Sequence, residues 1–161
     1  MKIICDSREH WTHPTSTDTH ISGWFDKHGI EWTVQKLDVG DYAVDGCPAI
    51  VVDRKASLQE VAQNLFARND KARFWREVRR AKEQGIKLIV LVEDSKCKTI
   101  QDVANWQPKY GKVTGRTLMN EMYRVHISYG VEFMFCNRRS TARRIVELLT
   151  EGETNGRIHE L

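Results

Sequence analysis

Hydrophobic and polar positions alternate along the chain in two patterns. Runs rich in β-branched and aromatic residues predict strands, and they occupy residues 2–6, 30–37, 42–44, 49–52, 86–92 and 131–136. Apolar residues at intervals of three and four predict helices, which are expected at about 17–28, 58–66, 70–84, 117–128 and 140–149. Together these elements predict an α/β fold, with a mixed central β-sheet and helices on both faces.

Turn and cap residues set several of these boundaries. Asp45-Gly46 separates two short extended runs and predicts a β-hairpin. Ser57 and Glu60 form a capping-box pattern before an apolar run, in which Glu60 would accept a hydrogen bond from the Ser57 backbone N–H. The apolar stripe of this helix cannot continue without burying arginines, so we expect a break between residues 67 and 70.

Composition predicts a single globular domain with no disulfide framework and no membrane span. The chain has 161 residues, of which 40% are hydrophobic and 29% charged, and we expect a folded domain at 1–150 followed by a polar tail at 151–161. No apolar run is long enough to span a membrane. The cysteines form no closely spaced pair, which predicts a reduced, cytoplasmic protein and not a secreted disulfide scaffold.

Positive charge is concentrated in two places, although the net charge is only +3. One is the segment 68–82 and the other is the segment 138–144, which puts arginines at a helix N-terminus where the helix dipole disfavours them. Clusters of this kind suit a phosphate backbone. The alternative is a solvated helix face, with Glu77 and Glu83 as local partners of the arginines.

Two carboxylates lie at the open end of the predicted hairpin. Asp41 opens the first arm, and Asp53-Arg54-Lys55 ends the second. Asp53 and Lys55 share a face because side chains alternate along a strand. Paired carboxylates call for a cation, and all-oxygen ligation favours Mg²⁺ or Mn²⁺. A lysine there can orient an attacking water or help to deprotonate it, which suggests phosphodiester hydrolysis, although Asp-x-Lys is also a common surface sequence.

Three segments together resemble a known family. Asp6-Ser7-Arg8-Glu9, Gly40-Asp41 and Asp53-Arg54-Lys55 are similar to the nuclease domain of the XPF-type structure-specific endonucleases, in the PD-(D/E)xK superfamily. The resemblance covers about residues 2–150. It implies a restriction-endonuclease-like nuclease core, of the compact stand-alone kind found in bacteria and their viruses.

The resemblance also implies roles for single residues. Asp41 and Asp53 match metal-binding acids, the backbone carbonyl of Arg54 looks like a third ligand, and Lys55 matches the catalytic lysine. Asp6 and Glu9 match outer acids that could hold a second metal or a water and so assist at the site, and Arg8 matches the arginine that braces them.

Two positions depart from the family pattern. Asp53 stands where the family has glutamate, which withdraws the carboxylate by one carbon–carbon bond, roughly 1.5 Å. The family places an acid four residues after the lysine, where this chain has Gln59. Glu60 would replace it only if one residue were inserted, and helix capping is the competing role of Glu60.

The leading hypothesis is a metal-dependent DNA endonuclease that uses Mg²⁺ or Mn²⁺ on branched, flap or junction DNA during repair or recombination. The residues expected to contact the DNA backbone are Arg8, Arg68, Arg76, Arg79, Arg80, Arg138 and Arg139. The alternative is an inactive XPF-like module for DNA binding or dimerisation, and a homodimer is compatible with both. Unrelated small-molecule chemistry lacks support, because the sequence has no glycine-rich phosphate loop.

Overall fold

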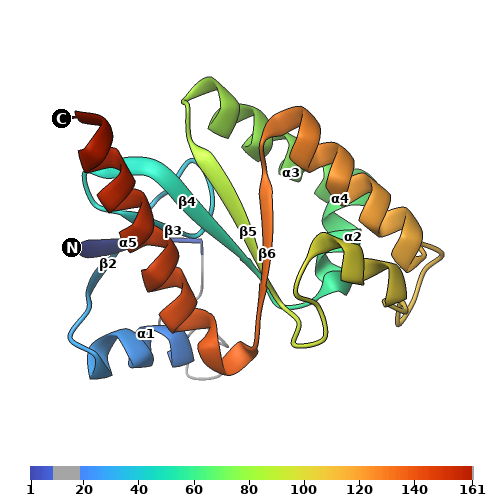
Figure 1. The fold of residues 1–161 in the computed structure, drawn as a ribbon, viewed down its shortest axis with the longest axis horizontal. Coiled ribbons are helices and arrows are strands. Elements are labelled where there is room, and N and C mark those ends of the chain that lie inside the picture. The colour runs from blue at the N-terminus through green and yellow to red at the C-terminus, as the bar shows by residue number, and fades with distance from the viewer. Residues whose placement is uncertain (9–18, 161) are drawn as a thin grey trace.

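A computed structural model describes residues 1–8 and 19–160 of the chain (Figure 1). The elements in chain order are β1 (Lys2–Asp6), α1 (Thr19–Lys27), β2 (Glu31–Gln35), β3 (Tyr42–Val44), β4 (Cys47–Lys55), α2 (Leu58–Phe66), α3 (Arg68–Glu83), β5 (Lys87–Glu93), η1 (Ile100–Asn105), α4 (Gly115–Tyr129), β6 (Glu132–Cys136), η2 (Arg138–Ser140) and α5 (Thr141–Glu160). The predicted α/β class is confirmed. The start of the first predicted helix lies outside the described residues.

The strands form one mixed sheet in the order β2-β1-β3-β4-β5-β6. Strands β1 and β2 are parallel, as are β4, β5 and β6, whereas β3 runs antiparallel to both of its neighbours. The predicted hairpin is β3–β4, and Gly46 in its turn has φ +75°. The start of β3 therefore meets the carboxyl ends of β1 and β4 at one edge of the sheet.

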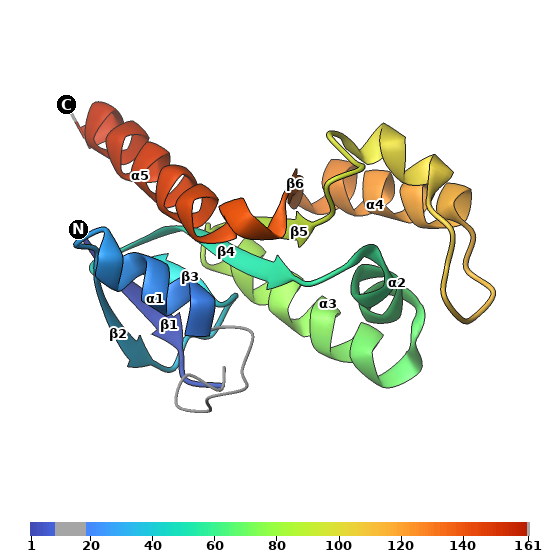
Figure 2. The ribbon, with the colours of Figure 1, turned by 90° about the horizontal axis from the view of Figure 1, so that it is seen from below.

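Helices cover both faces of the sheet, so the molecule has two hydrophobic cores. Helices α1 and α5 lie on one side, and α2, α3 and α4 lie on the other (Figure 1). Figure 2 shows α3 and α5 on opposite sides of β4. Strand β4 alternates between the cores: Val51 belongs to the core under α2–α4, and Val52 to the core under α1 and α5. Asp53 and Lys55 therefore share the face of α2 and α3, as predicted.

The helix break was predicted correctly. Ala67 has extended backbone (φ −73°, ψ 131°) between α2 and α3, so the two helices present different faces to the core. At the other end of the chain, α5 continues to Glu160, so the backbone of 151–160 is helical where a polar tail was expected. No helix among the described residues is long and apolar enough to cross a membrane.

Candidate active site

Asp41 is held in place from both neighbouring strands. Its backbone N–H donates to Val52 O at 2.9 Å, and its backbone carbonyl accepts from the Asp6 N–H at 2.8 Å. Its carboxylate oxygen Oδ2 accepts a hydrogen bond from the Arg54 N–H at 2.8 Å. The side chain is thus directed at the end of β4, where the predicted metal ligands lie.

Gly40 makes this position possible. Its φ of +69° lies in the left-handed region, and a Cβ built there would come 2.1 Å from Val51 Cγ1. Any side chain at this position would therefore push the turn away from β4. The glycine before Asp41 lets the carboxylate approach the strand that carries Asp53.

Asp53 and Lys55 form a buried ion pair. Lys55 Nζ lies 3.2 Å from Asp53 Oδ2, and the two side chains are 12% and 5% exposed. That carboxylate oxygen is buried and accepts no well-formed hydrogen bond from the described part of the chain. Its negative charge is therefore balanced by the lysine, and an added cation would find an acceptor there.

Lys55 is held in its charged form. Burial acts to lower its pKa, but the charges of Asp53, Asp41 and Glu60 outweigh burial and raise the pKa above the ordinary value. A lysine in this state acts as a hydrogen-bond donor. It can orient a water or a phosphate oxygen.

Glu77 of α3 belongs to this site, although the sequence placed it among the surface arginines. Its Oε1 accepts a hydrogen bond from the Gly40 N–H at 2.5 Å. Burial, followed by the charge of Asp53, raises the pKa of Glu77, while the Gly40 hydrogen bond opposes that shift. The interpretation as a local partner of the arginines was wrong. A useful signal was its position three residues after Phe74, on the buried stripe of α3.

Asp6 and Arg8 form a brace beside the site. Asp6 Oδ2 accepts from Arg8 Nε at 2.6 Å and Oδ1 accepts from the Leu37 N–H at 2.8 Å, while Arg8 Nη2 donates to Leu37 O at 3.0 Å. The bracing role predicted for Arg8 agrees with these contacts. Both oxygens of Asp6 therefore fix the segment that leads to Gly40. Glu9, the other predicted outer acid, lies outside the described residues.

The side chain of Arg54 points to the opposite face. Its Nε donates to Glu93 Oε1 at 2.5 Å, and the same oxygen accepts from Thr141 Oγ1 at 2.9 Å. The arginine and glutamate side chains are 9% and 3% exposed. Removing one partner of such a buried pair costs about 3–5 kcal/mol, so this network fixes the strand whose backbone passes Asp41.

Glu60 caps the helix, but not through the donor that the sequence predicted. Ser57 Oγ accepts from the Glu60 N–H at 3.2 Å, and Glu60 Oε2 accepts from the Ala56 N–H at 2.7 Å. The expected bond to the Ser57 N–H was therefore wrong by one residue. Glu60 also borders a cavity of about 290 Å³ that Lys55 lines as well, so capping does not remove it from the site.

Gln59, which stands where the family has an acid, is bonded to the loop before α4. Its Oε1 accepts from the Lys109 N–H at 2.9 Å, and its Nε2 donates to Tyr110 O at 3.3 Å. An ionised carboxylate could only accept. The amide therefore holds the loop before α4 against α2, which explains why glutamine suits this position.

The residues present fit a hard divalent cation. Asp41 and Asp53 supply carboxylate oxygens on one face, and Asp53 Oδ2 is the buried acceptor described above. Within residues 1–8 and 19–160, no three His, Cys, Asp or Glu side chains group closely enough to form a metal site by themselves. Mg²⁺ is commonly bound through one or two carboxylates with several retained waters, so a two-carboxylate site is sufficient.

Comparison with known families matches residues 5–149 to the ERCC4 domain. The chain belongs to the ERCC4 domain family. Domains of this family are generally nucleases. A comparison with curated proteins finds no match.

Two solved structures have the same fold as this ERCC4 domain. XPF from Aeropyrum pernix is 23% identical with a TM-score of 0.66, over 92% of this chain and 63% of that chain. XPF from Aeropyrum pernix in complex with DNA is 22% identical with a TM-score of 0.68, over 96% of this chain and 66% of that chain. The chain thus spans about two thirds of the XPF chains that it resembles.

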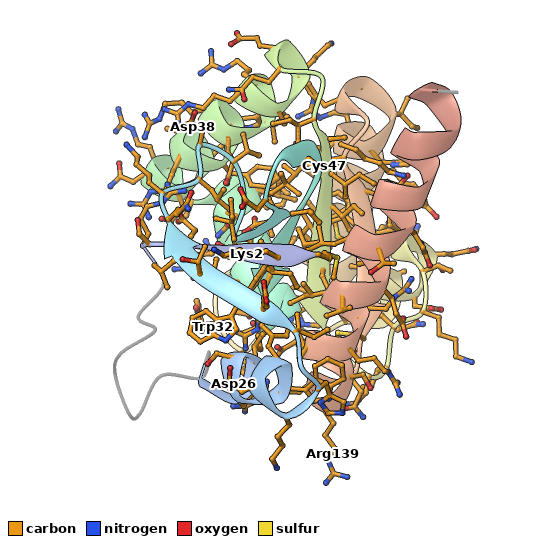
Figure 3. All side chains as sticks on the ribbon, turned by 90° about the vertical axis from the view of Figure 1, so that its left-hand side faces the viewer. Lys2, Asp26, Trp32, Asp38, Cys47 and Arg139 are labelled. Atoms are coloured by element: carbon orange, nitrogen blue, oxygen red, sulfur yellow. The ribbon has the colours of Figure 1, made fainter. Side chains whose placement is uncertain are left out.

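Apart from Arg8, which follows β1, the predicted DNA-contacting arginines of this ERCC4 domain lie in two separate regions. On α3, Arg68, Arg76, Arg79 and Arg80 are exposed, and Arg80 Nη1 contacts Asp38 O at 3.4 Å. Arg138 and Arg139 are exposed in η2. Figure 3 shows the labelled Arg139 at the end of the molecule beside α1, and Asp38 toward the opposite end. The two clusters therefore offer separate contact surfaces.

Proposed function

We propose that this ERCC4 domain is a divalent-metal-dependent DNA endonuclease that cuts branched, flap or junction DNA in repair or recombination. The observation that carries the proposal is the meeting of Asp41, Asp53 and Lys55 on one face of the sheet, where β3 begins and β4 ends. Family membership and the fold shared with a DNA-bound XPF support it.

Asp41, Asp53 and the backbone carbonyl of Arg54 would hold the ion, Mg²⁺ or Mn²⁺. When bound, the ion supplies charge stabilisation for the phosphate and a more acidic water. Lys55, protonated, orients a water or a phosphate oxygen from the side of Asp53. Glu77 and the Asp6–Arg8 brace keep the Gly40–Asp41 turn in place, and Glu9 remains a predicted assistant.

The DNA backbone would be bound through exposed arginines, because phosphate contacts give affinity without sequence preference. Arg68, Arg76, Arg79 and Arg80 line α3, Arg8 flanks Asp6, and Arg138 and Arg139 form the second cluster. Arg73 is an addition from the structure, since it lines the same small cavity as Lys55 and Glu77. It would place a positive charge next to the phosphate to be cut.

The test is a cleavage assay on flap, fork, Holliday-junction and linear DNA of equal length with Mg²⁺, Mn²⁺, Ca²⁺ or EDTA. We expect cuts near the single-strand/double-strand boundary with Mg²⁺ or Mn²⁺ and none with EDTA. Asp41→Asn serves as the inactive control. Cleavage that persists in EDTA, or that Asp41→Asn leaves unchanged, would contradict the proposed site.

A second candidate is an inactive module for DNA binding or dimerisation. The Lys55–Asp53 ion pair favours it, because the lysine already balances the shortened acid. This candidate predicts DNA binding without cleavage in any metal, including Mn²⁺. Gel filtration with light scattering would show whether the domain forms the homodimer that such a module would use.

A further inference from the structure

A second, larger cavity lies on the other side of the first turn of α2. Its volume is about 540 Å³, within the roughly 300–1,000 Å³ of small-ligand pockets. Its lining includes Ser57, Gln59, Asn105, Trp106, Gln107 and Lys109. Ser57 follows Lys55 by two residues, a chain span of at most about 7 Å. The cavity and the candidate active site therefore flank the same short turn.

Trp106 forms a fixed aromatic part of this cavity. It is half-buried and follows η1, and its backbone N–H donates to Val103 O at 2.9 Å. Gly115 opens α4 directly against it, since a Cβ at Gly115 would come 2.6 Å from Trp106 O. The absence of a side chain at this glycine lets α4 clamp the backbone that carries the indole.

The charges around the cavity nearly cancel, so they do not select an anion as its occupant. Glu93, Asp94 and Asp102 are in the lining. Glu93 is paired with Arg54, Asp94 accepts from the Lys96 N–H, and Asp102 caps η1 through the N–H groups of Lys98 and Thr99. Lys96 and Lys109 also line the cavity and offset the two remaining acids. The uncharged groups of the lining therefore decide which occupant fits, and they suit a neutral, planar and polar group.

Polar groups that could recognise such an occupant remain available. The side chains of Asn105 and Gln107 are exposed and make no hydrogen bond to the described residues, and the same holds for the indole N–H of Trp106. Gln59 is different, because both ends of its amide hold the 109–110 loop. An aromatic face and two amides with free donors and acceptors match the face and the edge of a nucleobase.

We propose that this cavity takes one unpaired nucleobase of the DNA strand whose phosphate lies at Lys55, stacked on Trp106. The proposal rests on the proposed function and specifies its substrate: the strand must be unpaired at this nucleotide. The amides of Asn105 and Gln107 contact the base edge, and Lys109 at the opening faces the sugar–phosphate chain. The site would then favour DNA with a single-stranded region next to the cut.

The test is a scan with the fluorescent base 2-aminopurine, placed at successive positions of a single-stranded flap around the cut site, in Ca²⁺ so that the DNA stays intact. The wild-type protein should change the fluorescence most at one position within a nucleotide or two of the cut. Trp106→Ala should remove that maximum and weaken flap binding about ten-fold, since stacking is worth ~1–3 kcal/mol per base. Binding to fully paired DNA should change less than two-fold.

Two further variants test whether the effect of Trp106→Ala comes from misfolding or from the loss of any aromatic residue. Trp106→Phe keeps a stacking ring in place and should retain the maximum. Trp32→Ala is the matched control, because Trp32 is on β2 and bonds Asp26 at 2.8 Å at the far edge of the sheet. It should leave the profile unchanged. The double variant Asn105→Ala/Gln107→Ala, which changes two exposed side chains, should lower flap affinity several-fold.

The outcomes separate this inference from the proposed function. Metal-dependent cleavage with a flat fluorescence profile, or with one that neither Trp106→Ala nor the Asn105/Gln107 pair alters, would overturn the nucleobase site alone. Absence of both DNA binding and cleavage in the wild-type protein would overturn both proposals. If Trp106→Ala does not fold, the Asn105/Gln107 pair decides by the same measurement.

Discussion

Lys55 Nζ and Asp53 Oδ2 lie 3.2 Å apart at the carboxyl end of β4, and both side chains are nearly buried. The lysine supplies the positive charge that a site with two close carboxylates needs. Binding a divalent cation at this position must therefore weaken or displace that ion pair. This relationship determines how metal affinity should respond to changes at Asp53.

Two substitutions of Asp53 should separate the effect of its charge on cleavage from the effect of its side-chain length. Asp53→Asn removes the charge and should abolish cleavage, because the amide binds a hard cation poorly. Asp53→Glu restores the family residue and should retain activity with a lower Mn²⁺ concentration for half-maximal rate, since its longer side chain can extend past Lys55. Metal titrations of cleavage measure both. Equal activity of all three proteins would remove Asp53 from the ligand set.

Asp41→Asn should abolish cleavage while DNA affinity stays within about two-fold of the wild type. The variant loses ligand charge, but its side-chain oxygen can still accept the Arg54 N–H, so the fold is retained. Cleavage rates and fluorescence anisotropy in Ca²⁺ are the measurements. The control is Asp38→Asn, a nearby acid outside the ligand set, and cutting by Asp41→Asn at the wild-type rate would place the metal elsewhere.

The raised pKa of Glu77 should be visible in the pH dependence of the protein's stability. Because the pKa of Glu77 is raised in the folded state, its ionisation destabilises the folded protein. This loss of stability is absent below the ordinary carboxyl pKa and is complete above the pKa that Glu77 has in the folded protein. Glu77→Gln removes that loss and can still accept the Gly40 N–H. We expect its melting temperature to exceed that of the wild type more at pH 8 than at pH 4, in EDTA.

Glu77→Ala tests the positioning role of the same residue. It leaves the Gly40 N–H without this acceptor, so we expect a several-fold rise in the metal concentration needed for cleavage, and rescue in Glu77→Gln. A melting-temperature difference between Glu77→Gln and wild type that is identical at pH 4 and pH 8 would contradict the raised pKa. Unchanged metal dependence in Glu77→Ala would contradict the positioning role.

The arginines of α3 should be separable from those of η2 by salt titration. Replacing Arg76, Arg79 and Arg80 with alanine should weaken binding to all DNAs alike and reduce the salt slope by about one unit per lost phosphate contact. Helix stability should change little, because alanine is a strong helix former. The comparison variant replaces Arg138 and Arg139. An unchanged slope in the α3 variant would assign backbone binding to η2.

Gln59→Asp should restore the family acid without improving activity. The carboxylate cannot donate to Tyr110 O, and it is shorter than the amide, so the loop before α4 should loosen at a cost of about 1 kcal/mol. Faster proteolytic cleavage between residues 107 and 113, with cleavage of DNA no faster than wild type, is the expected result. A marked gain in nuclease activity would return position 59 to the active site.

The sequence by itself determined the local features of this protein. Period-two alternation put Asp53 and Lys55 on one face, Asp45-Gly46 set the hairpin, and the broken apolar stripe set the boundary at Ala67. These predictions succeeded because each depends on residues a few positions apart, whose relative placement is fixed by strand or helix geometry. The predicted hairpin also identified Asp41 as the partner carboxylate, because its two arms bring Asp41 and Asp53 to the same end.

Only the tertiary structure decided which distant groups share the site. Glu77 reaches Gly40 across 37 positions, Gln59 holds a loop 50 positions away, and Glu93 takes the side chain of Arg54. Nothing local distinguishes these polar residues from neighbours that face the solvent. Their partners were set by the crossing of α3 over the sheet and by the parallel pairing of β4 with β5, because a hydrogen bond depends on the positions of both groups in space.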